Sequence, residues 1–399
     1  MNRNPDVVLF IRWLRGGGAE RVIANLANGL AERNLKVDLV LMQAEGEYLE
    51  TLHSNVRVVN LDTQSASAGR GWRPPTSFQS TGSLLKLVRY LKQYRPPVLL
   101  SATHYLNEIA LLAKQLAQVP TRVIVTEHTH LSQEFRLTEQ ISSKLIPWTV
   151  RALYRFADEV VAVSQGVAAD LDTFSPHRRK PTRVVYNSVV TPDIYRLAEA
   201  EVAHPWFQQK DLPIVIGSGR FVRQKDFPTL VRAFAHLRQT IPARLVLLGD
   251  GRDHAEILRL VEEFAIADHV WMPGFVSNPY AYMKKADVFA LSSAWEGLPT
   301  VLIEAIALGV PVVSTDCPSG PAEILKQGRY GRLVPVGDAV TLGDAIASTL
   351  QEDSPSVPQD WIREFTPEVA IRKYIDVLGL SPVIPSSTVH MMGSSIAIS

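Results

Sequence analysis

Two carboxylates eight residues apart have the clearest capacity for chemistry in this sequence. The segment EGLPTVLIE places Glu296 and Glu304 at the ends of a short loop and an apolar run. Pro299 suits the first position of a helix and Gly309 suits its end, so we expect a helix between them. Glu304 is the only charged residue in that apolar run. A carboxylate buried there needs a partner, either a structural arginine or a ligand.

The start of this predicted helix suits a phosphorylated sugar. Free backbone amides at a helix start attract phosphate or sugar oxygens. Glu304, one turn further on, can accept two hydrogen bonds from the vicinal hydroxyls of a ribose. Glu296 can accept hydrogen bonds from the hydroxyls of a second sugar and stabilise the positive charge that develops at its anomeric carbon. The expected contacts at the helix start are Gly297, Leu298, Pro299 and Thr300.

A cationic loop, GSGRFVRQKDF, follows a predicted strand of the second half. Gly219 allows a tight turn, and Arg220 and Lys225 are five residues apart. Two such cations can neutralise a diphosphate in place of a metal ion. The next two predicted strands end in small residues, LGDG and MPGFV, which suit the close approach of a planar base. The residues expected there are Gly249, Gly274, Phe275 and Val276.

A glycine loop, RGGGAER, follows the first predicted strand and opens a helix. Gly16, Gly17 and Gly18 would let phosphate oxygens approach the main chain. The G-x-G-x-x-G dinucleotide fingerprint fails, because Arg21 stands where its last glycine is required. The loop therefore favours phosphate over a dinucleotide, with a flexible turn as the alternative.

The segment TRVIVTEHTH ends another predicted buried strand in polar residues. We expect His128, just beyond the strand, to hydrogen-bond a substrate. A structural role is the alternative for His128, and it is the preferred interpretation for Glu127 and His130. Two further motifs are set aside as solvated surface: the D-x-D of Asp170 and Asp172, which lies in a helical pattern, and the basic run 177–183.

The elements that must position these residues form two successive series. Short β-branched runs alternate with helical patterns, first from DVVLFI to ADEVVAVS and again from PIVIGSGR to GRLVPV. This alternation predicts an α/β chain of two doubly wound, Rossmann-like domains facing a central cleft. We place the domains at residues 1–195 and 196–380, with the last helix packing back on the first domain.

Two segments carry the composition of irregular chain. We expect a disordered tail at 381–399 and a loop at 63–83. Trp72 and Phe78 in that loop are candidates for contact with an acceptor, and a plain surface insertion is the alternative.

Composition narrows the class of protein further. The 399 residues are 46% hydrophobic and 20% charged, with a single cysteine, Cys317. These values exclude a disulfide framework and a multi-cysteine metal site. No long apolar run or signal peptide is evident, so we expect a cytoplasmic location.

The charge is unevenly distributed along the chain. Residues 1–195 carry 23 Lys and Arg against 17 Asp and Glu, and the remainder carries 18 against 23. The basic first half is too weakly charged for nucleic acid. It permits peripheral contact with an anionic membrane, for which the segment 142–159, with Trp148 and Arg151, is a candidate. Packing of that segment on its own sheet is the alternative.

Together these motifs resemble the large family of retaining glycosyltransferases with the GT-B fold, family four or glycosyl transferases group 1. The resemblance covers roughly residues 5–380 and rests first on the E-x7-E of Glu296 and Glu304 within SSAWEG and ALGVPVVSTD. GRFVRQKDF is similar to the family's G-R-x-x-x-x-K-G, with Asp226 in place of the last glycine. GGGAER and TEHTH look like the family's glycine loop and the strand end with its donor-sugar histidine.

The resemblance implies a nucleotide diphosphate sugar in the second domain, and uridine is the nucleoside we expect. Arg220 and Lys225 would hold the diphosphate, Glu304 the ribose and Glu296 the sugar, with the backbone around Phe275 at the base. It further implies retention of configuration without a metal or other cofactor, and His128 as the donor-sugar histidine. CPSGPAEILKQGRYGRLVPVGD is similar to members that build lipid-linked or surface polysaccharides, so a glycan or lipid-linked acceptor is expected.

Two alternatives follow from the same residues. A glycogen-type synthase or an epimerase would share the fold and most of these motifs. A non-catalytic sugar-nucleotide or glycan-binding protein would bind the nucleotide without turnover. The presence of both carboxylates, both cations and His128 favours the transferase.

Overall fold

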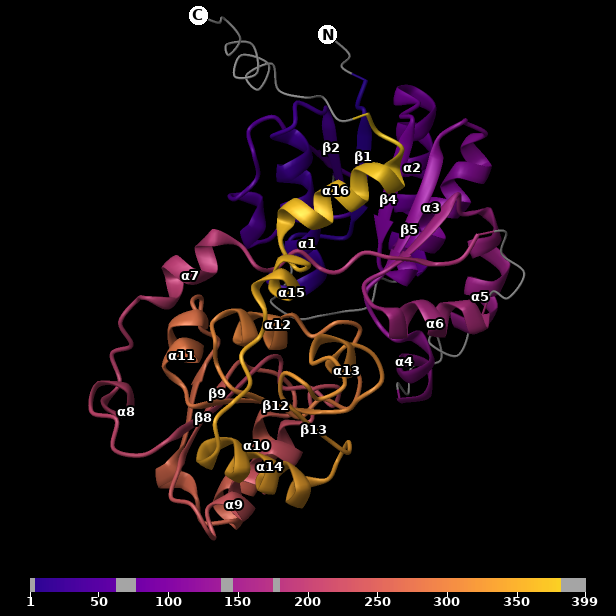
Figure 1. Cartoon of the computed structure of the whole chain (residues 1–399). Helices are drawn as coiled ribbons and strands as arrows, with labels where there is room; N and C mark the ends of the chain where they lie inside the picture. The colour runs from indigo at the N-terminus through magenta and orange to yellow at the C-terminus, as the bar shows by residue number, and fades with distance from the viewer. Residues whose placement is uncertain (1–3, 62–76, 138–145, 175–179, 382–399) are drawn as a thin grey trace, which may run out of the picture.

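The computed structural model describes residues 4–61, 77–137, 146–174 and 180–381. These residues form two parallel β-sheets, each flanked by helices, in two domains (Figure 1). The strands are apolar because a parallel sheet is covered on both faces, and the VVLFI run is buried at all five positions. The predicted α/β class with two Rossmann-like domains is confirmed.

The first domain has a seven-stranded sheet in the order β3-β2-β1-β4-β5-β6-β7. Its strands are β1 (Val7–Ile11), β2 (Val37–Leu41), β3 (Arg57–Asn60), β4 (Val98–Ala102), β5 (Arg122–Glu127), β6 (Glu159–Ala162) and β7 (Arg183–Val184). Its helices are α1 (Gly18–Ala31), α2 (Ser77–Tyr94), α3 (His104–Ala117), α4 (Leu131–Leu137), α5 (Ile146–Leu153) and α6 (Gln165–Phe174), with the 3-10 turns η1 (Glu47–Leu49) and η3 (Tyr154–Phe156).

The second domain has a six-stranded sheet in the order β10-β9-β8-β11-β12-β13. Its strands are β8 (Ile214–Ser218), β9 (Arg244–Leu248), β10 (Val270–Gly274), β11 (Val288–Leu291), β12 (Val312–Thr315) and β13 (Arg332–Val334). Its helices are α9 (Phe227–Leu237), α10 (His254–Glu263), α11 (Tyr280–Lys285), α12 (Thr300–Ala307), α13 (Pro321–Ile324) and α14 (Ala339–Gln351), with the 3-10 turn η4 (Ala267–His269).

The chain passes between the domains twice. It leaves the first through α7 (Pro192–Ala198) and α8 (Pro205–Gln208), and it returns through α15 (Gln359–Arg363) to α16 (Pro367–Leu378). Figure 1 shows α16 lying beside α1 of the first domain. A Cβ on Gly29 of α1 would lie 1.9 Å from the Cδ1 of Ile371, so the missing side chain permits this close packing.

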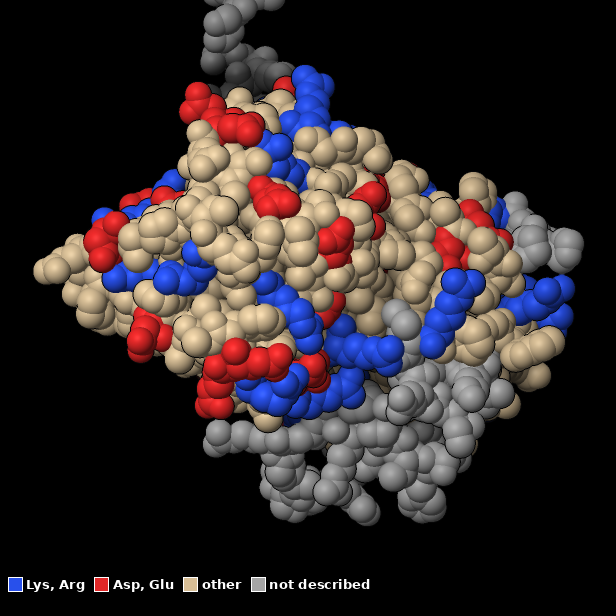
Figure 2. Space-filling model, turned by 90° about the horizontal axis from the view of Figure 1, so that it is seen from below, with Lys and Arg blue, Asp and Glu red and all other residues tan. Residues whose placement is uncertain are grey.

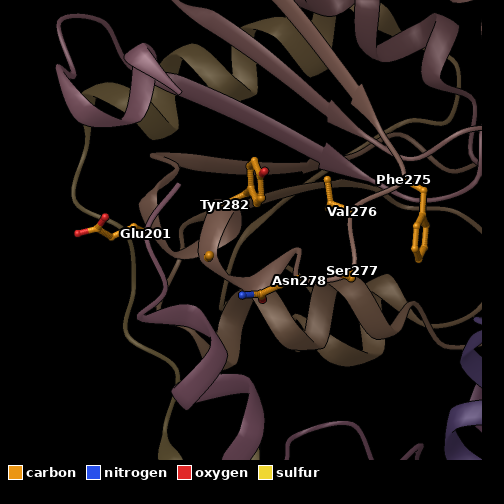
Figure 3. A pocket seen from close by; sticks show the side chains of 7 residues that line it. Glu201, Phe275, Val276, Ser277, Asn278 and Tyr282 are labelled. Atoms are coloured by element: carbon orange, nitrogen blue, oxygen red, sulfur yellow. The ribbon is translucent and has the colours of Figure 1, made fainter. Parts of the chain in front are cut away.

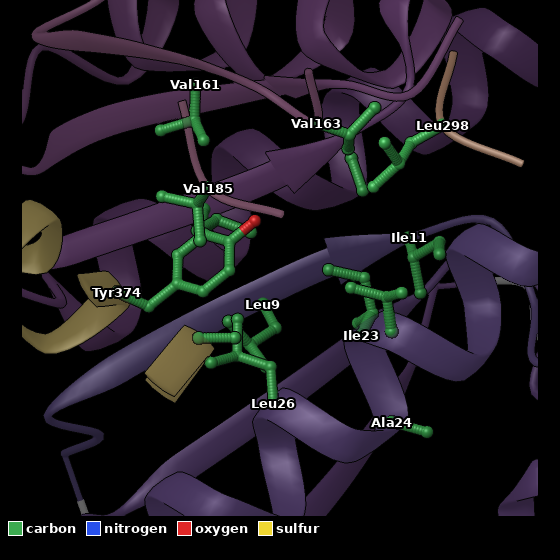
Figure 4. Packing of buried hydrophobic residues seen from close by; sticks show 14 of the residues in the cluster. Leu9, Ile11, Ile23, Ala24, Leu26, Val161, Val163, Val185, Leu298 and Tyr374 are labelled. Carbon is green, nitrogen blue, oxygen red and sulfur yellow. The ribbon is translucent and has the colours of Figure 1, made fainter. Parts of the chain in front are cut away.

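One apolar core continues across both domains. Leu298, which precedes α12, is 4% exposed, and Tyr374 of α16 is 2% exposed. Figure 4 shows both among the side chains of the first-domain core, which include Leu9, Ile23 and Val163. The two domains are therefore packed against each other through apolar side chains.

Two predicted irregular segments differ from the structure or lie outside it. The prediction of a loop at 63–83 is wrong in its second part, because α2 begins at Ser77. Phe78 therefore belongs to a helix. The first two turns of this helix contain a single apolar residue, so the sequence there lacks the apolar spacing by which a helix is predicted. Trp72 and residues 382–399 of the predicted tail lie outside the described residues.

Candidate functional site

The helix that carries Glu304 forms as the sequence predicts. Pro299 is its N-cap residue, α12 runs over Thr300–Ala307, and Gly309 follows with a φ of 74°. The glycine allows the left-handed turn that ends the helix. Glu304 is 2% exposed, which confirms that this lone charge is buried.

The partner of Glu304 is an arginine from the other domain. Arg21 Nη2 on α1 donates to Glu304 Oε1, and Nη1 donates to the hydroxyl of Tyr280 at 2.7 Å. Burial opposes the charge on Arg21, but the Glu304 carboxylate together with Tyr280 and Tyr48 outweighs it and raises the pKa of Arg21 above its ordinary value. The two residues are 283 positions apart in the chain, so no local sequence pattern predicts their contact. In the sequence Arg21 is distinguished only by standing where the dinucleotide fingerprint requires its last glycine.

Glu296 lies within the second domain and contacts the predicted diphosphate cation. It is 5% exposed, and it accepts hydrogen bonds from Lys225 Nζ at 2.5 Å and from Ser293 Oγ at 2.7 Å. β11 ends at Leu291 with Glu296 in the loop beyond it, and β8 ends at Ser218 with Lys225 in the loop beyond it. These strands are neighbours, and the sheet order reverses between them, which is where open α/β sheets bind ligands.

The loop after β8 places Arg220 at the surface and approaches the loop after β9 closely. A Cβ on Gly249 would lie 1.9 Å from the carbonyl oxygen of Gly219, so glycine is required there. Asp226, the departure from the family pattern, has a φ of 46° and a ψ of 47°, and its side chain accepts from the Thr229 amide. It therefore keeps the left-handed turn that a glycine would make and caps α9 as well.

His128 lies where the two domains touch. A Cβ on Gly297 would be 2.0 Å from the His128 carbonyl oxygen, and Ser164 Oγ donates to the Gly297 carbonyl at 2.8 Å. The Nε2 of His128 is 3.2 Å from Thr126 Oγ1, and its buried Nδ1 has no hydrogen-bond partner among the described residues. Burial lowers the pKa of His128 to about 4, so the ring is neutral at pH 7 and can bond a hydroxyl.

The glycine loop opens α1 as predicted, and Gly18 lies against the start of α12, with its Cβ position 3.7 Å from Thr300 Oγ1. The carboxylate of Glu20 lies beside Gly17, 2.0 Å from where a Cβ would be. Burial raises the pKa of Glu20, and Arg220 of the second domain opposes that rise. The glycines of one domain and the cationic loop of the other thus face each other.

The predicted base-contacting segment lines a pocket of about 350 Å³. Gly274, at the end of β10, has a φ of 81°, and Phe275 is 67% exposed. Figure 3 shows Phe275 and Val276 on this loop and Tyr282 of α11 near them. The lining residues are Glu201, Phe275, Val276, Ser277, Asn278, Ala281 and Tyr282.

Glu127 is held inside the first domain, away from this set of residues. It is fully buried and accepts from Tyr154 and, at 2.9 Å, from Asn107 Nδ2. Burial raises the pKa of Glu127 to about 7.

Asp170 corrects one interpretation of the sequence. It is 7% exposed and accepts from the Ser132 amide at 3.0 Å, and His130 Nδ1 lies 3.2 Å from its carboxylate. The prediction of a solvated helix surface is therefore wrong for Asp170, because α4 packs over that face of α6. The prediction of a solvated surface is confirmed for Asp172, which is exposed.

The surface of the first domain shows limited basic character. Lys180 pairs with Glu159 and Arg183 with Asp376, while 177–179 lie outside the described residues. Figure 2 shows basic and acidic side chains intermixed over the face seen from below. Within the described ranges no helix has the length and apolarity to cross a membrane, and no three His, Cys, Asp or Glu side chains cluster as metal ligands.

The protein has two Rossmann-like domains, and their facing loops carry these carboxylates, cations and glycines. This arrangement defines the GT-B class of fold. The chain belongs to the group 1, or family four, glycosyltransferases. The family model described as Glycosyl transferases group 1 matches residues 201–364, and the one described as Glycosyltransferase Family 4 matches residues 16–192. The family and the fold class that the sequence predicts are both confirmed.

Relatives and solved structures agree with this assignment. The chain is 30% identical over 349 residues, 86% of its length and 90% of the relative, to the N-acetylgalactosamine-N,N'-diacetylbacillosaminyl-diphospho-undecaprenol 4-alpha-N-acetylgalactosaminyltransferase of Campylobacter jejuni. It is 24% identical over 380 residues, 92% and 97% of the two chains, to the lipopolysaccharide core biosynthesis glycosyltransferase LpsE of Rhizobium meliloti. The structure of Anabaena HepE with UDP and glucose superposes with a TM-score of 0.73 at 20% identity, covering 94% and 99% of the chains.

Proposed function

We propose that this glycosyltransferase moves a hexose or N-acetylhexosamine from a UDP-sugar to a lipid-linked or glycan acceptor, with retention at the anomeric carbon and without a divalent metal. The observation that carries the proposal is the Lys225–Glu296 pair at the switch point of the second sheet, beside Arg220. A diphosphate bound there would meet two cations, and Glu296 would meet the sugar attached to it.

The nucleoside would extend from this point along the carboxyl ends of β8 to β10. Glu304, whose Oε1 already accepts from Arg21, would offer its other carboxylate oxygen to the ribose hydroxyls, and the Gly274 to Val276 loop would contact the base. The pocket of about 350 Å³ beside Phe275 and Val276 leaves room near a planar base. The UDP complex of HepE supports uridine as the first nucleotide to test.

The transfer itself is a substitution at the anomeric carbon. The acceptor hydroxyl forms a bond to that carbon, the bond to the β-phosphate oxygen breaks, and UDP leaves with the bonding electron pair. The departing phosphate takes the acceptor's proton on the same face of the sugar, so the configuration is kept. Arg220 and Lys225 would stabilise the charge on the leaving diphosphate, and the neutral His128 would orient the sugar through a hydrogen bond.

The relatives support the proposed class of acceptor. The Campylobacter relative acts on a diphospho-undecaprenol-linked sugar, and LpsE acts in lipopolysaccharide core biosynthesis. Both support an acceptor that is presented at a membrane.

The deciding experiment measures nucleotide release from uridine, guanosine and adenosine diphosphate sugars, with chelator present and a lipid extract as acceptor source. We expect release from one donor that grows with the amount of extract, and a product whose anomeric configuration, determined by NMR, matches the donor. Binding without release from any donor would favour the sugar-nucleotide-binding alternative. Elongation of a glucan would favour the synthase, and release of an isomerised sugar without acceptor would favour the epimerase.

Two variants test the assignment of the site. Glu304→Ala is expected to weaken UDP binding by about tenfold, the loss of a charge-assisted hydrogen-bonded contact. His128→Ala is expected to reduce turnover with little change in UDP affinity. Glu263→Ala, on the exposed face of α10, is the matched control for removal of a carboxylate. Normal kinetics in both site variants would refute these roles.

We further propose a cytoplasmic location with peripheral membrane contact through α5. Trp148 is 73% exposed and shares the outer surface of α5 and η3 with Arg151 and Arg155. An aromatic ring beside cations suits the interface of an anionic bilayer. Co-sedimentation with anionic vesicles at low salt is expected to decrease in Trp148→Ala and to remain unchanged in Arg259→Gln. Failure of the wild-type protein to sediment with the vesicles would exclude this contact.

A further inference from the structure

The first sheet has a switch point of its own. Its strand order reverses between β1 and β4, just as that of the second sheet reverses between β8 and β11. Ligands of open α/β sheets bind beyond the carboxyl ends of the strands at such reversals. The loops after β1 and β4 are therefore the places to look for a second ligand, distinct from the nucleotide.

The loop after β1 holds two guanidinium groups on one indole ring. The Cζ of Arg12 lies 3.9 Å from the ring centre of Trp13, and the Cζ of Arg15 lies 4.3 Å from it. Trp13 is fixed in turn, because its Nε1 donates to Glu20 Oε1 at 3.2 Å. A stacked guanidinium keeps its donors in the plane of the group, where they suit the oxygens of a phosphoryl group.

The contacts of Arg15 permit exchange for an external anion. Its pair with Glu45 is 2.7 Å long, but the two side chains are 37% and 41% exposed. A pair so open to solvent contributes little free energy, so an incoming phosphoryl group can replace it at small cost. Two arginines held a fixed distance from one ring would then provide a preformed site.

The segment after β4 adds a strained residue and a tyrosine close to Arg12. Thr103 has a φ of 78° and a ψ of 141°, which is a strained backbone conformation for a residue with a branched side chain. Backbone strain of this kind is found preferentially at functional sites. Tyr105, two residues further, lies near enough to Arg12 to raise its pKa and so favour its charged form. Burial lowers the pKa of Arg12, so the fold keeps a partly desolvated cation at this point.

The position of this cluster relates it to the donor site. Glu20 accepts a hydrogen bond from Trp13 and lies near enough to Arg220 of the second domain for that charge to lower its pKa. The two arginines therefore stand on the first-domain side of the cation that would hold the donor diphosphate. A ligand bound to them would lie in the domain that faces the transferred sugar.

We propose that Arg12 and Arg15, held on the ring of Trp13, bind a phosphoryl group of the acceptor. This inference rests on the proposed transferase function and names the chemistry of its acceptor: a saccharide that carries a phosphate or diphosphate. Two guanidinium groups match the charge and the several oxygens of such a group better than they match a neutral glycan.

The test uses inorganic pyrophosphate as the probe, titrated calorimetrically into the full chain with UDP already saturating the nucleotide site. The wild-type protein is expected to bind one pyrophosphate. Arg12→Gln and Arg15→Gln are each expected to weaken this binding by about tenfold or more. Arg155→Gln is the matched control, because Arg155 also stacks on an aromatic ring, 4.7 Å from the centre of Phe156, in the same domain.

A second measurement separates binding from folding. The same saccharide is offered as a short-chain lipid diphosphate and as a neutral alkyl glycoside. Arg12→Gln is expected to raise the KM for the diphosphate acceptor alone, with the KM for the donor and the thermal midpoint of unfolding unchanged. An equal effect on both acceptors would overturn the proposal, as would pyrophosphate binding that is absent in wild type or survives both substitutions.

These results are independent of the proposed transferase activity. Pyrophosphate binding needs no turnover, so its loss in the arginine variants would support the subsite even if no donor were consumed. Conversely, release of UDP by a protein that does not bind pyrophosphate would support the transferase and refute the subsite.

Discussion

Replacement of Arg21 by methionine removes one half of the ion pair that joins the two domains. Arg21 on α1 and Glu304 on α12 contact each other directly, and Tyr280 bonds the same guanidinium at 2.7 Å. Methionine retains most of the length and apolar surface of the arginine side chain. The change therefore isolates the charge and leaves Glu304, 2% exposed, without its cation.

The size of the effect follows from the burial of the two partners. Breaking a buried ion pair by removal of one partner costs about 3–5 kcal/mol. The Arg21 side chain is 21% exposed, so water can reach part of the pair, and we expect the lower end, about 3 kcal/mol. Glu304→Gln keeps a hydrogen-bond acceptor for Arg21 and is expected to cost about 1–2 kcal/mol. The double variant is expected to lose about 2 kcal/mol less than the sum of the two.

The assay is urea unfolding of the four proteins of this cycle, followed by tryptophan fluorescence. Hydrogen exchange of the α12 amides supplies a local measurement for the same helix. Arg259→Met is the matched control, because Arg259 pairs with Glu263 at 2.6 Å where the side chains are 61% and 54% exposed. Its cost is expected to be below about 0.5 kcal/mol.

Two results would refute this reasoning. If Arg21→Met unfolded within about 0.5 kcal/mol of wild type, Glu304 would not depend on the arginine for its burial. If the two single effects simply added, the residues would not be energetically coupled, whatever their distance.

Three further predictions concern pH, the contact between the domains and one helix cap. Burial raises the pKa of Glu127 to about 7, so the folded state holds its proton longer than the unfolded chain, and this residue makes stability fall as pH rises from 4.5 to 7. Burial lowers the pKa of His128 to about 4, which makes stability rise between pH 4 and 6.5 and so offsets the effect of Glu127 over most of that range. Glu127→Gln should therefore shift the slope of thermal midpoint against pH upward, and His128→Asn should shift it downward; equal slopes in both variants would contradict this. Gly297→Ala would put a Cβ 2.0 Å from the His128 carbonyl oxygen, and we expect X-ray scattering to show a more open protein with reduced turnover, whereas an unchanged scattering curve would exclude a contact this tight. Asp226→Ala loses a cap in left-handed conformation and should cost about 1–2 kcal/mol in urea unfolding, with Asp226→Gly costing less; the opposite order would show that the turn does not limit stability.

The elements of this protein could be predicted from the sequence because their signals are local. Parallel strands covered on both faces require continuous apolar runs, so VVLFI and the runs like it identify the two sheets. Pro299 and Gly309 identify the limits of α12, and the apolar residues between them show that Glu304 is buried. The motifs at the strand ends were sufficient to recognise the family.

The partners of the charged residues were decided by the tertiary structure. Apolar periodicity predicts that a residue is buried, but it does not predict which side chain it contacts. The bond between Arg21 and Glu304, which are 283 positions apart, therefore forms only when the two domains pack together. The same is true of Asp170, which is covered by α4 rather than by water, and of Gly297 against His128. The stack of Arg12 and Arg15 on Trp13 likewise depends on how the loop after β1 closes, because the spacing of three residues in a loop does not determine which rings and cations meet.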